Sequence, residues 1–139
     1  MVDTYNPKDI DIIVGGFIAS GFSDDKVTVK RDEDMWKDES GADDEVVRYA
    51  TNDKRSEIEI TLQQTSSFNF TLSTLAKTDE LSGAGTIPVI VKDNRGRDLH
   101  AAPTAWIVQI PEAKYSKGIQ VRTWRIRTDN LQNFLGGAA

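Results

Sequence analysis

The sequence predicts a mainly β fold, an antiparallel β-sandwich or partly open β-barrel of about seven or eight strands with one flanking α-helix. Three observations predict it: apolar and polar residues alternate with period two in several short segments, turn-forming residues separate these segments, and one segment alone repeats its apolar residues with the period of a helix. Hydrophobic residues make up 38% of the 139 residues, which is enough for one core. We expect a single domain over residues 1–139.

The clearest strand covers residues 57–62, where three aliphatic side chains alternate with three polar ones. The aliphatic set is Ile58, Ile60 and Leu62, and the polar set is Glu57, Glu59 and Thr61. Such alternation is typical of a strand with one face in the core and one face in solvent. The same pattern predicts strands over residues 26–31, 46–51 and 105–110, with these inward-facing side chains: Val27 and Val29, Val47 and Tyr49, and Trp106, Val108 and Ile110.

Glycines and turn residues divide the remaining apolar segments. Three glycines interrupt residues 10–22, which predicts a first strand with a bulge or a close backbone approach. Residues 86–92 and 99–102 flank the turn-forming residues 93–96 and therefore predict a hairpin. The last long strand, over residues 119–128, changes its apolar face midway, and a bulge or a change of packing partner explains this change.

One segment, residues 67–77, has a helical pattern, with its apolar residues at the spacing of one helix face. These residues are Phe68, Leu72, Leu75 and Ala76. A hydroxyl among Thr65, Ser66 and Ser67 is placed to cap the helix at its start. We expect this helix to cover one opening of the β structure.

The longest irregular segment is residues 32–45, between two predicted strands, and we predict that it is a long acidic loop. A loop of about 14 residues in a compact domain usually has a function. The side chains expected to act there are Asp32, Glu33, Asp34, Met35, Trp36, Asp38, Glu39, Asp43, Asp44 and Glu45. Trp36 either folds back on its own domain or is buried against a neighbouring subunit, and the sequence leaves both alternatives open.

The residue inventory argues against an enzyme. The chain has no cysteine, which excludes disulfides, thiolate metal sites and cysteine nucleophiles. Its single histidine, His100, has no nucleophile or carboxylate at a spacing typical of a catalytic pair. The formal net charge of −5 argues against a protein that binds nucleic acid by neutralising phosphates. We predict no catalytic residues, no cofactor and no metal.

Positive charge gathers in a second segment, opposite in sign to the acidic one. Its bases are Lys114, Lys117, Arg122, Arg125 and Arg127. If the acidic loop of one copy meets this basic surface of another, the contact is heterologous and either closes into a ring or extends as a filament. Two unrelated solvated faces are the alternative interpretation of the same charges.

Ten short segments spread over nearly the whole chain carry a resemblance to a known family: residues 5–9, 12–16, 29–34, 41–45, 51–55, 60–65, 88–89, 93–97, 105–106 and 130–137. In their order and spacing they resemble the tail tube proteins of contractile-tailed bacteriophages, of the Mu-like and prophage type. The resemblance implies a non-enzymatic subunit, found in the virion tail and made in the host cytoplasm, that forms hexameric rings. These rings stack into a tube inside a contractile sheath.

The resemblance also implies partners and roles. The partners are further copies of the chain, the sheath protein, the baseplate and the tape-measure protein; DNA passes without specific binding, and no membrane is bound. The loop between early strands contacts the next ring in such proteins, and here that loop is residues 32–45. A lumen that passes DNA is expected to be acidic or neutral, with Glu57, Glu59 and Thr61, or alternatively Arg48 and Ala50, as candidates. The order of the termini, residues 1–7 and 130–139, is left open.

Two other functions fit the same residues. A secretion-system tube protein of the type VI kind would form similar rings but carry proteins instead of DNA. A monomeric β-sandwich that binds sugar or protein through Trp36 is the alternative from a different class.

Overall fold

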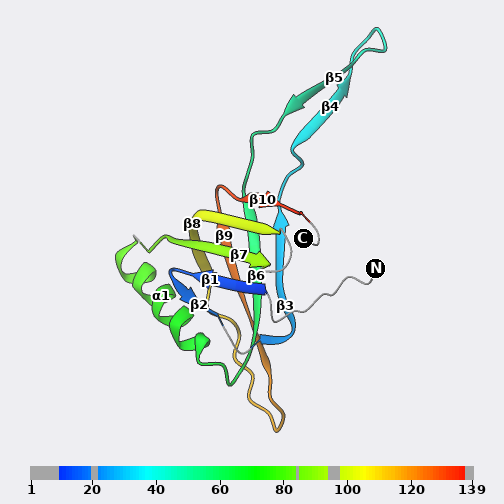
Figure 1. Ribbon diagram of the computed structural model, residues 1–139. Helices are drawn as coiled ribbons and strands as arrows, with labels where there is room; N and C mark the ends of the chain where they lie inside the picture. Colours follow the sequence, from blue (N-terminus) through cyan, green and yellow to red (C-terminus); the bar gives the residue numbers. More distant parts are fainter. Residues whose placement is uncertain (1–9, 20–21, 84, 94–97, 137–139) are drawn as a thin grey trace.

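A computed structural model describes residues 10–19, 22–83, 85–93 and 98–136, with the backbone alone described for residues 22–26. It contains ten strands and one helix in these residues (Figure 1). The strands are β1 Ile10–Val14, β2 Phe17–Ile18, β3 Phe22–Arg31, β4 Trp36–Ser40, β5 Val46–Ala50, β6 Ser56–Gln63, β7 Ile87–Asp93, β8 Leu99–Gln109, β9 Val121–Thr128 and β10 Gln132–Phe134, and the helix is α1 Phe68–Ser82.

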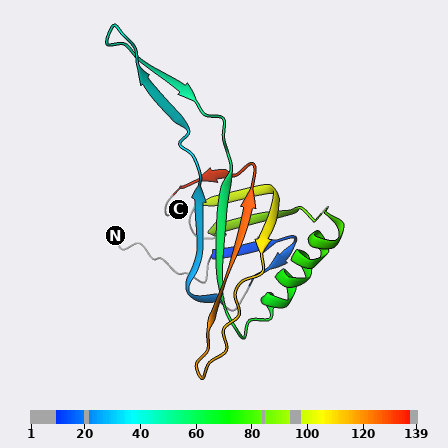
Figure 2. The same ribbon diagram turned by 180° about the vertical axis from the view of Figure 1, so that it is seen from behind.

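Eight of the strands form one strongly bent antiparallel sheet, in the order β2-β1-β7-β8-β9-β6-β3, with β10 paired to β8. The sheet does not close into a barrel, and it folds over itself so that α1 lies along one flank (Figures 1 and 2). The predicted fold class is thereby confirmed: the chain is mainly β, antiparallel and open, with one helix. The strand number exceeds the expected seven or eight because β2, β4 and β10 are additional strands.

Strand β8 turns the sheet from one layer into the other. Its first residues pair with β7 and β10, whereas Ala105 and the residues after it pair with β9. Pro103, at the bend, is exposed, as expected for a residue that cannot donate to a ladder. The sequence predicted two separate strands here, and the structure joins them. A register shift at the bend, where three residues of β8 span two of β7, puts both Ala102 and Ala105 into the core.

The inward faces predicted for the second half of β8 are wrong. Val108 and Ile110 are exposed and Trp106 is only half-buried, because the bulge in β8 between Ala102 and Ala105 puts Ala105 and Ile107 on the inner side instead. Alternation predicts burial only while the ladder stays regular, and here it does not.

The core lies between the two layers and under α1. Strand β6 contributes Ile58, Ile60 and Leu62, all fully buried, as the alternation predicted. Burying one such side chain completely is worth about 1.5–3 kcal/mol. From β9, Trp124 and Ile126 face them. The bulge or change of packing partner predicted for this strand is wrong, because β9 pairs with β6 without a register shift over eight residue pairs and Ile119 and Val121 are exposed.

Helix α1 is fixed to the sheet by one buried polar contact. The indole Nε1 of Trp124 donates a hydrogen bond to Asn69 Oδ1 at 2.9 Å, while Asn69 Nδ2 donates to the carbonyl oxygen of Gln63 at 3.0 Å. The Ser66 hydroxyl accepts from the Phe68 amide at 3.2 Å, which satisfies one donor at the helix start. The helix begins one residue later and ends five residues later than predicted, and its C-cap is Gly83, whose φ of 68° suits glycine.

The glycines at 15 and 16 form a turn, not the predicted bulge. Their φ values of 60° and 89° belong to a two-residue hairpin turn that joins β1 to β2. The predicted hairpin of β7 and β8 is confirmed by its pairing, although turn residues 94–97 lie outside the described part of the chain. Toward the C-terminus, Leu131 is buried and β10 pairs with β8; residues 1–9 and 137–139 lie outside the described residues.

Candidate assembly surfaces

The prediction of a long acidic loop over residues 32–45 is wrong in part. This segment contains strand β4, which pairs with β5 over five registered residue pairs. We call residues 33–50 the arm; it projects away from the body as a two-stranded ribbon (Figure 1). The ribbon turns at residues 41–45, where the Gly41 amide donates to the Glu45 carbonyl oxygen at 2.8 Å and Asp44 has a φ of 60°. Strand β4 has no apolar alternation, so the sequence did not predict it.

Strand β5 was predicted to be half-buried, and this is wrong: every residue of β4 and β5 is exposed. Val46 is 70% exposed, and Trp36, which does not fold back on the body, is 47% exposed. Met35, Val47 and Tyr49 are exposed as well. A two-stranded ribbon is marginally stable alone in water, and grouped exposed apolar side chains mark interaction sites.

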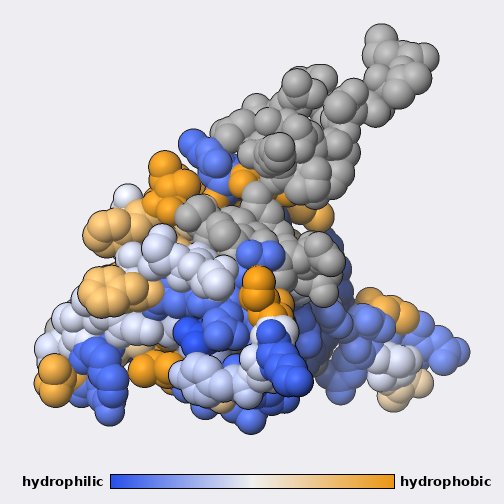
Figure 3. Space-filling view, turned by 90° about the horizontal axis from the view of Figure 1, so that it is seen from below, coloured by the Kyte–Doolittle hydropathy of each residue, from blue (hydrophilic) through white to orange (hydrophobic). Residues whose placement is uncertain are grey.

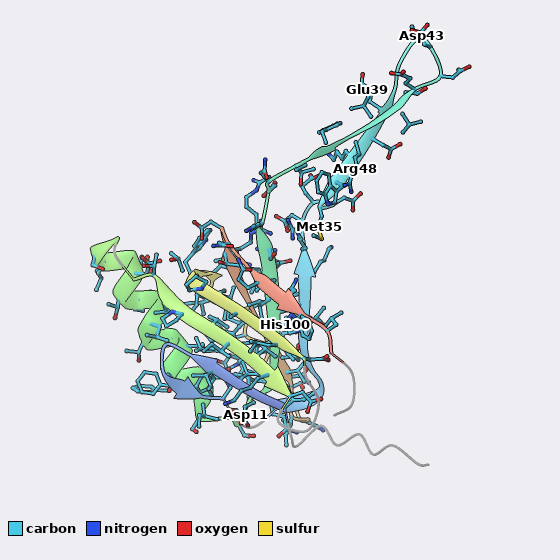
Figure 4. All side chains as sticks on the ribbon, turned by 45° about the horizontal axis from the view of Figure 1, so that its top comes forward. Asp11, Met35, Glu39, Asp43, Arg48 and His100 are labelled. Atoms are coloured by element: carbon cyan, nitrogen blue, oxygen red, sulfur yellow. The ribbon has the colours of Figure 1, made fainter. Side chains whose placement is uncertain are left out.

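Each face of the arm combines acidic and apolar side chains. On one face the Arg48 guanidinium lies over the Trp36 ring, 4.2 Å from its centroid, in a cation–π contact. On the other face Lys37 Nζ pairs with Glu33 Oε2 at 3.1 Å, and this partner raises the pKa of Lys37. Figure 4 shows Glu39, Asp43 and Arg48 along the arm and Met35 at its base.

The base of the arm is held by hydrogen bonds to β3, β6 and their continuations. Thr51 Oγ1 donates to the Asp34 carbonyl oxygen at 2.6 Å, and the Arg31 guanidinium donates to the Asp53 carbonyl oxygen at 2.8 Å. The Asp53 carboxylate accepts from Arg55 at 2.9 Å, which lowers the pKa of Asp53 to about 2. The arm is therefore anchored in the sheet at its base and exposed beyond it.

The five predicted basic residues do not form one surface. Lys114 and Lys117 are exposed in the connection between β8 and β9, at the end of the molecule opposite the arm (Figure 2). Arg125 and Arg127 instead lie on the outer face of the sheet, where Arg125 Nε is 3.7 Å from Glu57 Oε1 and Arg127 pairs with Asp32. Exposed Tyr115 and Ile119 accompany the lysines. Seen from below, hydrophobic side chains lie in several separate groups among hydrophilic ones (Figure 3).

The structure brings together the three lumen candidates Glu57, Glu59 and Thr61, on the face of β6 that points away from the core. Thr61 Oγ1 lies 3.3 Å from Thr123 Oγ1 on β9. The alternative candidates Arg48 and Ala50 belong to the arm. We call the outer side of β3, β6 and β9 the polar face; its described charged residues are Lys30, Asp32, Glu57, Glu59, Arg125 and Arg127.

The remaining candidates for chemistry are few. His100 lines a cleft of about 310 Å³ at the open end of the sandwich, and its Nδ1 lies 2.7 Å from Asn133 Oδ1 (Figure 4). In the described ranges, no three His, Cys, Asp or Glu residues group to hold a metal. The described helix also lacks the length and apolar character needed to cross a membrane.

The described chain is an open sandwich with a projecting, exposed two-stranded ribbon. Residues 12–136 match the family described as "Bacteriophage PhiTE tail tube protein", so the chain belongs to this phage tail tube family. The chain is 31% identical over 143 aligned residues to "Structural protein ORF10" of Pseudomonas phage KPP10, covering 96% of this chain and 83% of that protein. The family predicted from sequence resemblance, a phage tail tube protein, is confirmed.

A solved structure shares the fold. The anti-feeding prophage cap, described as a tube-terminating cap, matches with a TM-score of 0.64, over 98% of this chain and 95% of that chain. The two sequences are only 8% identical, so the likeness concerns the fold alone.

Proposed function

We propose that the chain forms hexameric rings, and that these rings stack into the tail tube through which phage DNA is delivered inside a contractile sheath. The observation that carries the proposal is the arm: its apolar side chains are exposed although they lie on a regular ribbon. In a ring stack, a neighbouring copy covers them. The sheath, baseplate and tape-measure proteins are the further partners of such a tube in the virion tail.

The arm and the β8–β9 connection are complementary and lie at opposite ends of the molecule (Figure 2). The arm carries an excess of acids beside Trp36 and Val47, whereas the connection carries Lys114 and Lys117 beside Tyr115. A contact between the two is head-to-tail and repeats without limit along one axis. The proposed basic partner surface is therefore limited to Lys114 and Lys117. Arg125 and Arg127 are paired within the chain, and Arg122 is half-buried opposite Leu62.

Ring closure is proposed to use the free edge of the sheet. Strand β3 ends the strand order, with no neighbouring strand on its outer side among the described residues. An unpaired edge is a template for another chain, and closure of a ring removes every such edge. In this arrangement the polar face lines the lumen.

Sedimentation velocity and negative-stain microscopy of the purified chain test the proposal. Rings or tubes that grow with concentration are expected. A subunit that stays monomeric over the whole concentration range, with its arm intact, contradicts it.

A tube that carries proteins, as in a type VI secretion system, is the alternative within the same architecture, and the shared fold with an anti-feeding prophage protein favours keeping it. Purified virions decide between the two: the phage alternative expects this chain in particles that package and eject DNA. A monomeric sugar-binding module is disfavoured because Arg48 lies over the Trp36 ring that a sugar would need.

A further inference from the structure

The polar face combines bases and acids in alternating positions across three strands. Glu57 lies between Lys30 on β3 and Arg127 on β9, and Glu59 lies between Thr28 and Arg125. Directly opposed residues on one face of an antiparallel pair have Cβ atoms about 5 Å apart, so these charges interact. The charged residues named for this face are three bases and three acids, and Arg55, which pairs with Asp53, borders them beside Asp32.

The arginines use their donors on neighbouring carboxylates. Arg127 Nη1 donates to Asp32 Oδ1 at 3.2 Å, and its Nη2 pairs with Asp32 Oδ2. This hydrogen bond raises the pKa of Arg127, with a smaller contribution from the charge of Glu57. Arg125 Nε faces Glu57 Oε1, and the side chain of Glu57 is only 18% exposed while that of Arg125 is 44% exposed.

This mixed face differs from a purely basic face and from a purely acidic face, the two simple alternatives for a wall that meets DNA. Lys30, Arg125 and Arg127 without their partners would form a line of bases, and each phosphate contact they made would release a counterion and retain the DNA. A purely acidic face would lack the arginines altogether. Here the bases are present: carboxylates of the same chain pair with Arg125 and Arg127, and Glu57 lies opposite Lys30 in the ladder.

We propose that Glu57, Glu59 and Asp32 act as built-in counterions that mask a latent DNA-binding surface formed by Lys30, Arg125 and Arg127. The inference rests on the proposed position of this face in the lumen. The three carboxylates then prevent phosphate binding because they occupy the neighbouring bases. The overall negative charge of the chain is not what keeps DNA mobile.

The double variant Glu57→Gln/Glu59→Gln tests the masking. Fluorescence anisotropy with a 20-bp duplex is measured on the full-length chain at a concentration where sedimentation shows unassembled subunits. We expect binding at least roughly tenfold tighter than wild type at 50 mM salt, with a logarithmic salt slope of about −2 for the two bases freed, Lys30 and Arg125, because Asp32 still pairs with Arg127. The matched control Glu80→Gln/Glu112→Gln removes two acidic charges as well but leaves the polar face intact, and it should bind DNA as weakly as wild type.

A second pair of variants separates masking from misfolding. Adding Lys30→Gln and Arg125→Gln to the double variant should abolish the gained affinity, while circular dichroism verifies the fold of both. If the double variant does not fold, Asp32→Asn frees Arg127 alone, and a gain of about threefold is expected. Equal DNA affinity of wild type and the folded polar-face variants overturns the masking, as does an equal gain in the control.

Assembly is scored separately from DNA binding. If the wild-type chain forms rings but the polar-face variants bind no DNA, the tube proposal holds and the masking proposal is refuted. If the wild-type chain never forms rings, the tube proposal is refuted, whether or not the variants bind DNA.

Discussion

Strands β6 and β5 each carry three large apolar side chains, but they differ in the exposure of these side chains. In β6, Ile58, Ile60 and Leu62 are fully buried between the layers, whereas in β5 Val46, Val47 and Tyr49 are all exposed. Both strands are paired and regular. Apolar residues in a β segment therefore predict that the segment forms a paired strand. They do not predict that the same chain covers these apolar side chains.

The largest effect on the free energy of unfolding is expected from the body. Ile60→Ala removes a fully buried side chain next to Trp124 and leaves a cavity, so we expect a loss of about 2–5 kcal/mol. Urea denaturation of the unassembled subunit measures it. A loss below about 1 kcal/mol would show that the two layers collapse onto the vacant space and that β6 is less central than its burial indicates.

A smaller loss is expected from the contact that fixes α1. Asn69→Ala leaves the buried Trp124 Nε1 without its acceptor, which costs about 1–3 kcal/mol. Trp124 fluorescence and urea denaturation follow the change, and Asn69→Asp, which keeps the acceptor for Trp124 but loses the Nδ2 donor to Gln63, separates the two hydrogen bonds. Equal stability of the alanine variant and wild type would refute the structural role of this pair.

The arm is expected to contribute little to the stability of the subunit. Trp36→Ser/Val47→Ser changes two exposed side chains, so the free energy of unfolding should change by no more than about 0.5 kcal/mol for each. Ring stacking should nevertheless be lost, as seen in sedimentation. Phe70→Ser, on the exposed side of α1, is the control that removes exposed apolar surface elsewhere. Normal tubes from the arm variant would contradict the stacking role.

The smallest effect concerns pH at the base of the arm. Arg55 lowers the pKa of Asp53 to about 2. Because the folded-state value lies below the usual one, the stabilising contribution is present above about pH 4 and is lost as the pH falls toward 2. An NMR titration of the Asp53 carboxyl should give the low value, and Arg55→Gln should return it toward the ordinary range. An unchanged titration in that variant would mean that Arg55 is not the cause.

The sequence predicted the fold class, the alternating burial of β6 and the family because each depends on local pattern or on motif order. It failed where a pattern depends on distant geometry. The exposure of Val108 follows from a register shift in β8, and the pairing of Arg127 with Asp32 joins residues 95 positions apart. Neither is encoded in local spacing. The arm was missed because β4 has no apolar alternation, although its partner β5 was predicted as a strand.

The anchoring of the arm has a mechanical consequence. The arm continues from the end of β3 and the start of β6, roughly along the strand direction (Figure 1). A pull on the arm along the strand direction therefore loads the whole length of the ladder between β6 and β9. This ladder is registered over eight residue pairs. Hydrogen bonds loaded in shear share the force and break together, unlike those of a hairpin opened from one end. When a stack joined through such arms is extended, the force would act on the joints between subunits, and these joints would separate before the subunits themselves unfold.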